Sequence, residues 1–275
     1  MTRREAGSGR LAVLAATFVV SFVAAALASS RVLPSRVFGA VSRTSTLPVY
    51  AGGPLAKLPS AFVIPRLVPL SDPTADTRWA PVLRATVARR QPSFKAAPVG
   101  RVPARTPDGT TNIVVAEREA YENGTTWVRV GLAVLPNGTE GWVPRSSLGG
   151  WSFVDTRLVI DRARLTATLF RAGRVVFRAP VGIGAPGTPT PAGQFYVRDR
   201  LSGFSSPFYG PLAFGTNARS PTLTDWPGGG VVGIHGTDQP GLIPGQISHG
   251  CVRLTDAAIL KLGRLMPVGT PVTIE

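Results

Sequence analysis

The chain has 275 residues, and its 30 Lys and Arg residues outnumber 15 Asp and Glu residues, which gives a formal net charge of +15. This length accommodates two domains with extensions. Positive charge attracts polyanions, so nucleic acid and an anionic cell envelope are both candidate partners. No basic run is interleaved with aromatic residues and no zinc-finger pattern occurs, which argues against nucleic acid. A single cysteine excludes an intramolecular disulfide bond.

The amino terminus has the pattern of an export signal. Three arginines within the first ten residues precede an apolar run over residues 11–28, which ends in the small-x-small sequence Ala26-Leu27-Ala28. The run is also barely long enough to span a membrane, so residues 1–30 are either a signal peptide or a hydrophobic anchor helix. Arginines before the run place the rest of the chain outside the cytoplasm. We therefore expect an extracytoplasmic protein, at the cell wall or at the outer face of the cytoplasmic membrane, that binds no nucleic acid.

A spacer and a small β-domain are predicted next. Residues 31–78 are rich in Pro, Ala and Ser and show no sustained period, so they predict a spacer with one short strand over 61–64. Residues 79–148 predict a small β-domain, in which Asn123-Gly124 and Asn137-Gly138 form hairpin turns. Its strands are expected over residues 111–116, 126–130 and 140–144.

This small β-domain has one recognisable similarity. The sequence Trp127-Val-Arg-Val and the later Gly141-Trp-Val resemble bacterial SH3-like domains, which often flank catalytic domains in cell-wall enzymes. The alternative is a generic small barrel that supports its neighbour.

Residues 153–275 predict a second, β-rich domain, shaped as a sandwich or barrel with one or two short helices. Ala172-Gly173 predicts a hairpin, and a helix is expected over 257–265 with Thr255 or Asp256 as its cap. Residues 182–187 match the dinucleotide pattern G-x-G-x-x-G, but the prolines that follow exclude the required helix, so we predict a loop. Strands are expected over residues 157–160, 165–170, 175–179, 194–198, 231–234 and 271–274.

The only cysteine and both histidines lie within residues 235–251. Cysteine is a strong nucleophile and histidine titrates near neutrality, so their proximity predicts an acyl-transfer site. The alternatives are a buried apolar thiol with structural histidines, or a metal site, for which one Cys and two His are too few. We expect no metal and no cofactor. If residues 248–253 are extended, His249, Cys251 and Arg253 share one face of the strand. Positive charge on the neighbouring imidazoles and on Arg253 then lowers the pKa of the Cys251 thiol.

At this site the chain resembles a known family. The sequence SHGCVRL at residues 248–254 and the box IHGT at 234–237 resemble the signature of L,D-transpeptidases with a YkuD-type catalytic domain. The similarity covers about residues 155–275 and includes the stretches 188–193 and 269–272. The resemblance implies an enzyme that cross-links peptidoglycan between third-position diaminopimelate residues of two stem peptides, through a thioester on Cys251.

The resemblance also implies roles for single residues. His235 would act as general acid/base, with its ring oriented by the carbonyl of Gly236. His249 would support the site and is the rival base, and Gly250 would supply an oxyanion donor from its backbone together with its neighbours. Substrate contacts are assigned to Ser248, Arg253, Trp226 and Tyr209. For Trp226, Tyr209 and the Gly228–Gly230 run, a structural role is slightly favoured over one in the donor groove.

Two alternatives in function stay open. The same domain could use water as acceptor and act as an L,D-carboxypeptidase, or it could be a catalytically degenerate wall-binding protein. The expected partners are stem peptides and anionic wall polymers, and also the membrane if the N-terminal segment is uncleaved.

Overall fold

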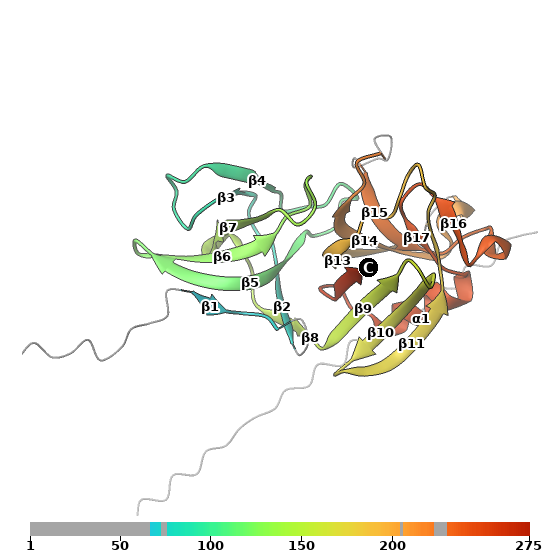
Figure 1. The fold of residues 1–275 in the computed structure, drawn as a ribbon. Coiled ribbons are helices and arrows are strands. Elements are labelled where there is room, and N and C mark those ends of the chain that lie inside the picture. The colour runs from blue at the N-terminus through green and yellow to red at the C-terminus, as the bar shows by residue number, and fades with distance from the viewer. Residues whose placement is uncertain (1–66, 73–75, 204–205, 223–229) are drawn as a thin grey trace, which may run out of the picture. The chain divides into compact units, whose positions relative to one another are not determined.

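The computed structural model describes residues 67–72, 76–203, 206–222 and 230–275 (Figure 1). The predicted signal or anchor segment, most of the spacer and the short strand expected over 61–64 lie outside these residues. Within the described ranges, no helix is both long and apolar enough to cross a membrane. The described chain is mainly β, as predicted, with two sheets and a single α-helix.

The first sheet has eight strands in the order β4-β3-β7-β6-β5-β2-β8, with β1 paired to β5. It begins earlier than the pattern predicts, because β1 and the start of β2 lie in the stretch assigned to the spacer. The strands are β1 (Val68–Pro69), β2 (Thr77–Pro81), β3 (Thr86–Arg89), β4 (Pro98–Val102), β5 (Ile113–Glu122), β6 (Thr125–Gly131), β7 (Glu140–Pro144) and β8 (Ser152–Val154), and a 3-10 turn, η1 (Arg145–Ser147), follows β7.

The two Asn-Gly pairs of this sheet behave differently. Asn123 and Gly124 have φ values of 50° and 76° and join β5 to β6 in the tight hairpin that was predicted. Asn137-Gly138 lies instead in a longer connection between β6 and β7. The side chain of Asn137 there donates a hydrogen bond to the carbonyl of Arg219 (2.7 Å), so this pair links the connection to the second sheet.

The second sheet has ten strands in the order β11-β10-β9-β18-β13-β14-β15-β17-β12-β16 and curls on itself. Its strands are β9 (Thr156–Asp161), β10 (Thr166–Arg171), β11 (Arg174–Pro180), β12 (Gly182–Gly184), β13 (Gly193–Ser202), β14 (Leu212–Arg219), β15 (Val231–His235), β16 (Gly245–Ser248), β17 (Val252–Arg253) and β18 (Pro271–Ile274). Two 3-10 turns, η2 (Pro207–Tyr209) and η3 (Pro240–Leu242), lie in its connections.

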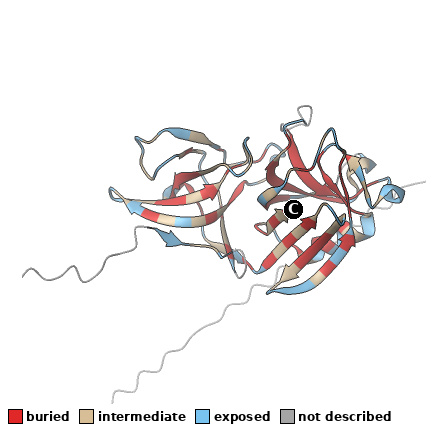
Figure 2. Ribbon diagram, viewed as in Figure 1, coloured by how far each residue is buried: buried red, intermediate tan, exposed pale blue. Residues whose placement is uncertain are grey.

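Local sequence signals account for much of this second sheet. Ala172 and Gly173 have φ values of 45° and 75° and form the predicted hairpin between β10 and β11. The helix α1 (Asp256–Leu265) begins at the predicted cap, where the Thr255 hydroxyl accepts a hydrogen bond from the Ala258 N–H (3.3 Å). Its buried face packs on the sheet, and Figure 2 shows the buried strands that form this core.

The two sheets belong to one compact unit. The hydroxyl of Tyr196 on β13 donates to the carbonyl of Gly131 on β6 (2.9 Å). Gly269, in the turn before β18, has a φ of 89° and lies so close to Trp79 of β2 that an added Cβ would be 2.3 Å from the indole. The junction therefore requires glycine at this position for both conformation and space.

We expect Gly269→Ala to lower the free energy of unfolding more than Gly173→Ala does. Both glycines have positive φ, but a Cβ on Gly173 meets no atom within 4 Å. The difference therefore isolates the clash with Trp79, and overpacking of this kind typically costs about 1–3 kcal/mol. Urea unfolding of both variants measures it. Equal losses would mean that the Trp79 side chain moves aside without cost.

Candidate active site

Two parallel strands bring the cysteine and the first histidine together. β15 and β17 are neighbours, with Ile234 opposite Val252 and His235 opposite Arg253. Side chains two residues apart on extended chain point to the same face of a sheet, so Cys251 lies on the face of Arg253 and His235. The connection over residues 236–247, which contains η3 and the start of β16, carries the chain from the end of β15 back to its beginning, so that β17 runs parallel to β15. Its prolines and glycines predict this turning path.

Gly233 lies next to both the Cys251 thiol and the His235 imidazole. Its N–H donates a hydrogen bond to the Cys251 Sγ (3.4 Å). A Cβ at this position would be 3.8 Å from that sulfur and 3.8 Å from the His235 Cδ2. Cδ2 is the ring carbon bonded to Nε2, so the Nε2 edge of the imidazole and the thiol both border the position of Gly233. The sequence analysis did not identify Gly233.

The His235 ring has one defined tautomer. Its Nδ1 lies 2.6 Å from the Gly236 carbonyl oxygen, and because a carbonyl only accepts, Nδ1 carries the proton. The Gly236 prediction therefore agrees with the geometry. Nε2 is buried and has no partner among the described residues. The imidazole thus presents a free lone pair in a site where His235 is 1% and Cys251 6% exposed.

The segment before the cysteine is not the continuous strand that was predicted. Gly250 has a φ of 122°, which breaks the chain between β16 and β17. His249 is consequently exposed and does not share the buried face of Cys251 and Arg253. The expectation that His249, Cys251 and Arg253 share one face was wrong for this reason.

Within this turn, the Ser248 hydroxyl holds the backbone. It donates to the Cys251 carbonyl (2.6 Å) and accepts from the Gly250 N–H (3.1 Å). The Gly250 N–H thus already has a partner, and the hydroxyl proton of Ser248 is used within the turn rather than turned toward a substrate. Among the described residues, the N–H groups of His249 and Cys251 have no such partner.

The stretch that resembles a dinucleotide motif packs against this turn. The loop predicted over residues 182–187 was wrong for its first part, because residues 182–184 pair as strand β12. The hydroxyl of Thr190 donates to the Gly250 carbonyl (2.9 Å) and accepts from the Gly184 N–H (2.8 Å). Thr188 donates to the Ser248 carbonyl (3.0 Å). Residues 184–190 therefore shape the cysteine turn, and residues 185–192 form no helix, as the prolines predict.

Aromatic residues of η2 cover the buried pair. The Tyr209 ring meets the His235 ring edge to face at 5.1 Å, and the guanidinium of Arg253 lies 4.3 Å from the centre of the Phe208 ring. Two of the substrate-contact residues that the sequence suggested, Tyr209 and Arg253, thus lie at the site. Phe208 also lies there, although no sequence pattern indicated it. Trp226 and Gly228–Gly229 fall outside the described residues.

Asp256 is a further residue whose position the sequence analysis did not explain. Its Oδ1 accepts a hydrogen bond from the Thr237 N–H (3.1 Å) and crowds Gly236. It thereby fixes the backbone whose carbonyl orients His235. In the described part of the chain, no group of three or more His, Cys, Asp and Glu side chains is arranged to hold a metal ion.

Comparison with known proteins agrees with this geometry. Residues 155–274 match the family model of the L,D-transpeptidase catalytic domain, YkuD. The matched residues contain the second sheet, α1 and the Cys251 site.

Curated relatives match the same region. YkuD of Bacillus subtilis, classed as an L,D-transpeptidase, is 33% identical over 110 residues, which are 40% of this chain and 60% of the relative. Its counterpart in Bacillus licheniformis is 30% identical over 118 residues, 43% of this chain and 64% of the relative. The chain thus spans less than two thirds of the length of each of these relatives.

Solved structures of L,D-transpeptidases also resemble it. The catalytic domain of the E. faecium enzyme is 28% identical and covers 44% of this chain and 97% of its own, with a TM-score of 0.33. An L,D-transpeptidase from Xylanimonas cellulosilytica is 27% identical and covers 44% of this chain and 61% of its own, also with a TM-score of 0.33. The similarity to the L,D-transpeptidase catalytic domain lies in the sequence match over residues 155–274.

Burial determines the charge state of the Cys251 site. It raises the pKa of the Cys251 thiol, against the opposing effects of the Gly233 N–H and the Arg253 charge. Burial also lowers the pKa of His235 to about 4, assisted by Arg253. The expected lowering of the thiol pKa was therefore wrong, because desolvation outweighs the positive neighbours. At neutral pH the resting pair is a thiol and a neutral imidazole.

The buried His235 predicts a loss of stability in acid. Its folded pKa, about 4, lies below the ordinary 6.5, so the unfolded chain takes up a proton in this window before the folded one does. The free energy of unfolding should fall by roughly 3 kcal/mol between pH 6.5 and 4 from this group alone. Urea unfolding across the window measures it. His235→Gln should lack this contribution and His249→Gln, at an exposed position, should retain it; equal curves for both variants would contradict the assignment.

The single thiol allows its ionisation to be followed directly. Alkylation of Cys251 by iodoacetamide should be slow at pH 7 and still increasing above pH 9, because burial raises the thiol pKa. Arg253→Gln should move the profile to higher pH, since the Arg253 charge favours the thiolate. Arg174→Gln, an exposed arginine on β11, should leave it unchanged. A rate that reaches its plateau below pH 8 would contradict the raised pKa.

Proposed function

We propose that this protein is a peptidoglycan L,D-transpeptidase that joins the third-position diaminopimelate residues of two stem peptides. One observation carries the proposal: the Cys251 thiol and the Nε2 edge of the His235 ring both border Gly233, within residues that match this family. Thiol and base are the two groups that acyl transfer requires.

The first half-reaction forms the acyl-enzyme. The Nε2 of His235 takes the thiol proton as the Cys251 sulfur attacks the carbonyl carbon of the third residue of a donor tetrapeptide. The amide bond to the terminal D-Ala breaks, and its nitrogen takes the proton from the imidazolium. D-Ala leaves as a free amino acid, and a thioester remains on Cys251.

The second half-reaction resolves the thioester. The side-chain amine of diaminopimelate on another stem attacks the thioester carbonyl and gives a proton to His235. The carbon–sulfur bond breaks, and the imidazolium returns its proton to the Cys251 sulfur. A new amide bond forms, and the thiol and neutral imidazole of the resting enzyme are restored.

The turn around the cysteine suggests how the oxyanion is stabilised. The N–H groups of His249 and Cys251 are the candidate donors, since Ser248 already occupies the Gly250 N–H. Gly250 contributes through its backbone conformation. Arg253 is proposed to hold a carboxylate of the donor stem, because its buried Nε has no partner among the described residues.

Two competing functions use the same domain. In an L,D-carboxypeptidase, water replaces the acceptor amine, and the product is a tripeptide. A wall-binding protein without turnover would need neither the neutral imidazole nor the thiol. The pairing of the two groups favours an enzyme, and the acceptor is what the experiment must identify.

The function is tested by incubating the full-length protein with a disaccharide-tetrapeptide and analysing the products by mass spectrometry. A cross-linked dimer with release of D-Ala is the expected result. Tripeptide without dimer would indicate the carboxypeptidase, and no product would indicate the wall-binding protein.

Variants connect this activity to the site. Cys251→Ser and Cys251→Ala should form neither acyl-enzyme nor dimer. His235→Ala should lower the rate on the order of a hundredfold or more, as the loss of a general acid/base does. A larger defect in His249→Ala, at unchanged stability, would make the exposed histidine the base instead.

The proposal includes a location and a domain organisation. The protein acts outside the cytoplasm, at the wall or the outer membrane face, with residues 1–30 as signal peptide or membrane anchor. Most of the excess positive charge lies before residue 151, outside the catalytic domain, and favours anionic wall polymers. Residues 79–148 are proposed to form an SH3-like domain; the hairpin at Asn123-Gly124 and the Gly141-Trp-Val sequence support it.

A further inference from the structure

The two backbone N–H groups that are candidate oxyanion donors each share a peptide group with a carbonyl. The Cys251 N–H belongs to the same peptide group as the Gly250 carbonyl, and the His249 N–H to the same one as the Ser248 carbonyl. Both peptide bonds are trans, and in a planar trans peptide the C=O and the N–H point in opposite directions. Contacts that fix the two carbonyls therefore also fix the directions of the two N–H groups.

A short segment between β12 and β13 holds both carbonyls. The Thr190 hydroxyl donates to the Gly250 carbonyl (2.9 Å), and the Thr188 hydroxyl donates to the Ser248 carbonyl (3.0 Å). The Ala185 N–H is a second donor to the Ser248 carbonyl (2.8 Å). The segment thus binds the cysteine turn through the two peptide groups that carry the candidate oxyanion donors.

Thr190 is itself fixed on the second sheet. It is 1% exposed, and its hydroxyl oxygen accepts a hydrogen bond from the Gly184 N–H at the end of β12 (2.8 Å). A hydroxyl has one proton and a carbonyl only accepts, so that proton points to the Gly250 carbonyl. The Thr190 side chain therefore connects β12 to the cysteine turn by two hydrogen bonds of defined direction.

The peptide group between these two is held as well. Its N–H, which belongs to Gly250, donates to the Ser248 hydroxyl (3.1 Å). Gly250 has a φ of 122°, a conformation that glycine adopts readily and also leaves readily. Hydrogen bonds at three successive peptide groups therefore keep the turn in this one conformation.

We propose that Thr188 and Thr190 are positioning residues that orient the oxyanion donors of the Cys251 site. This inference rests on the acyl-transfer function proposed above. Oxyanion donors are effective because they are fixed in place before charge develops on the substrate oxygen. The two threonines supply this fixation from the side of the chain opposite to the N–H groups.

The two threonines should differ in importance. Valine has nearly the shape of threonine, so Thr190→Val removes the donor to the Gly250 carbonyl and lets the peptide group of the Cys251 N–H rotate. In Thr188→Val, the Ser248 carbonyl keeps its hydrogen bond from the Ala185 N–H. Loss of the Thr190 hydroxyl should therefore have the larger effect.

The test compares two reactions of the same thiol in the full-length protein. With p-nitrophenyl acetate, a bond forms between the Cys251 sulfur and the carbonyl carbon, the ester C–O bond breaks, p-nitrophenolate leaves, and the thiol proton passes to His235. This acylation passes through an oxyanion. Alkylation by iodoacetamide displaces iodide and forms none. Access to the thiol and its ionisation affect both rates, so the ratio of acylation to alkylation reports on the oxyanion donors. Cys251→Ala supplies the blank.

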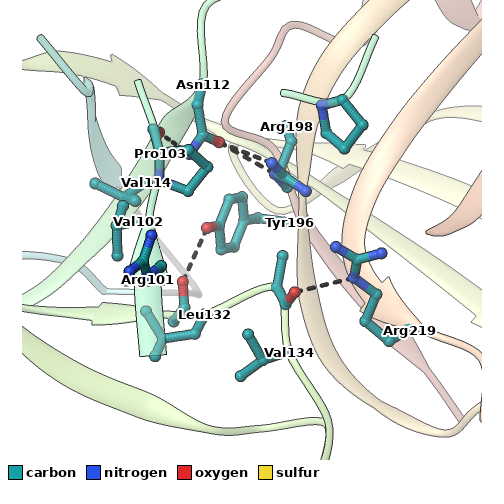
Figure 3. A pocket seen from close by; sticks show the side chains of 13 residues that line it. Arg101, Val102, Pro103, Asn112, Val114, Leu132, Val134, Tyr196, Arg198 and Arg219 are labelled. Atoms are coloured by element: carbon teal, nitrogen blue, oxygen red, sulfur yellow. Dashed lines mark hydrogen bonds between the residues drawn. The ribbon is translucent and has the colours of Figure 1, made fainter. Parts of the chain in front are cut away.

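Thr190→Val should lower this ratio about tenfold or more, since removing an oxyanion donor outright costs roughly 100- to 1000-fold. Thr188→Val should lower it less. Thr190→Ser keeps the hydroxyl and should restore the ratio to near the wild-type value. Tyr196→Phe is the matched control, because it also removes a hydroxyl that donates to a backbone carbonyl, that of Gly131 (2.9 Å), at the junction of the two sheets (Figure 3). Its ratio should equal that of the wild type.

An unchanged ratio in both valine variants would overturn the proposal, as would an equal fall in Tyr196→Phe or a wild-type protein that the ester does not acylate. If Thr190→Val does not fold, the half-buried Thr188 decides. A fall in Thr188→Val that Thr188→Ser reverses would support the proposal, and no fall would overturn it. Failure of the proposed function is distinct: a wild type that the ester acylates, but that makes no dimer from the disaccharide-tetrapeptide, would contradict the transpeptidase and not the role of the threonines.

Discussion

The parallel pairing of β15 with β17 is the constraint on which the site depends. It sets His235 opposite Arg253 and thereby puts Cys251 on the same face as both. Gly233 lies beside both groups, since a Cβ there would be 3.8 Å from the sulfur and 3.8 Å from the His235 Cδ2. A shift of one residue in this register would turn the cysteine away from the histidine. The rest of the sheet and α1 hold these two short strands in place.

Burial then decides how the chemistry begins. A low-dielectric surrounding disfavours charge on either partner, so the thiol of Cys251 and the imidazole of His235 are both neutral at rest. The Gly236 carbonyl holds the proton on Nδ1 and leaves Nε2 as the acceptor. Charge therefore forms only as the sulfur attacks. The positive charge of the nearby Arg253 stabilises the Cys251 thiolate but destabilises the His235 imidazolium. It therefore favours one of the two charges that form during the attack and opposes the other.

Much of this protein could be predicted from the sequence alone. The hairpin at Ala172-Gly173 and the cap at Thr255 depend on neighbouring residues, so local propensity was enough to find them. The strand that carries His235 and the clustering of both histidines with Cys251 were also visible in the sequence. The absence of a helix directly after residues 182–187 needed only the prolines that follow. These features share one cause, since each depends on residues that are close along the chain.

Other properties were decided only by the tertiary structure. The φ of Gly250 turns His249 outward, although an extended segment would have placed it beside Cys251. The thiol pKa rises because residues from distant strands bury it, which no count of nearby cations reveals. Thr188 and Thr190 each lie 60 residues before the carbonyl that they hold in the cysteine turn. Burial, charge proximity and backbone breaks depend on contacts between distant segments, and the sequence by itself does not specify which segments meet.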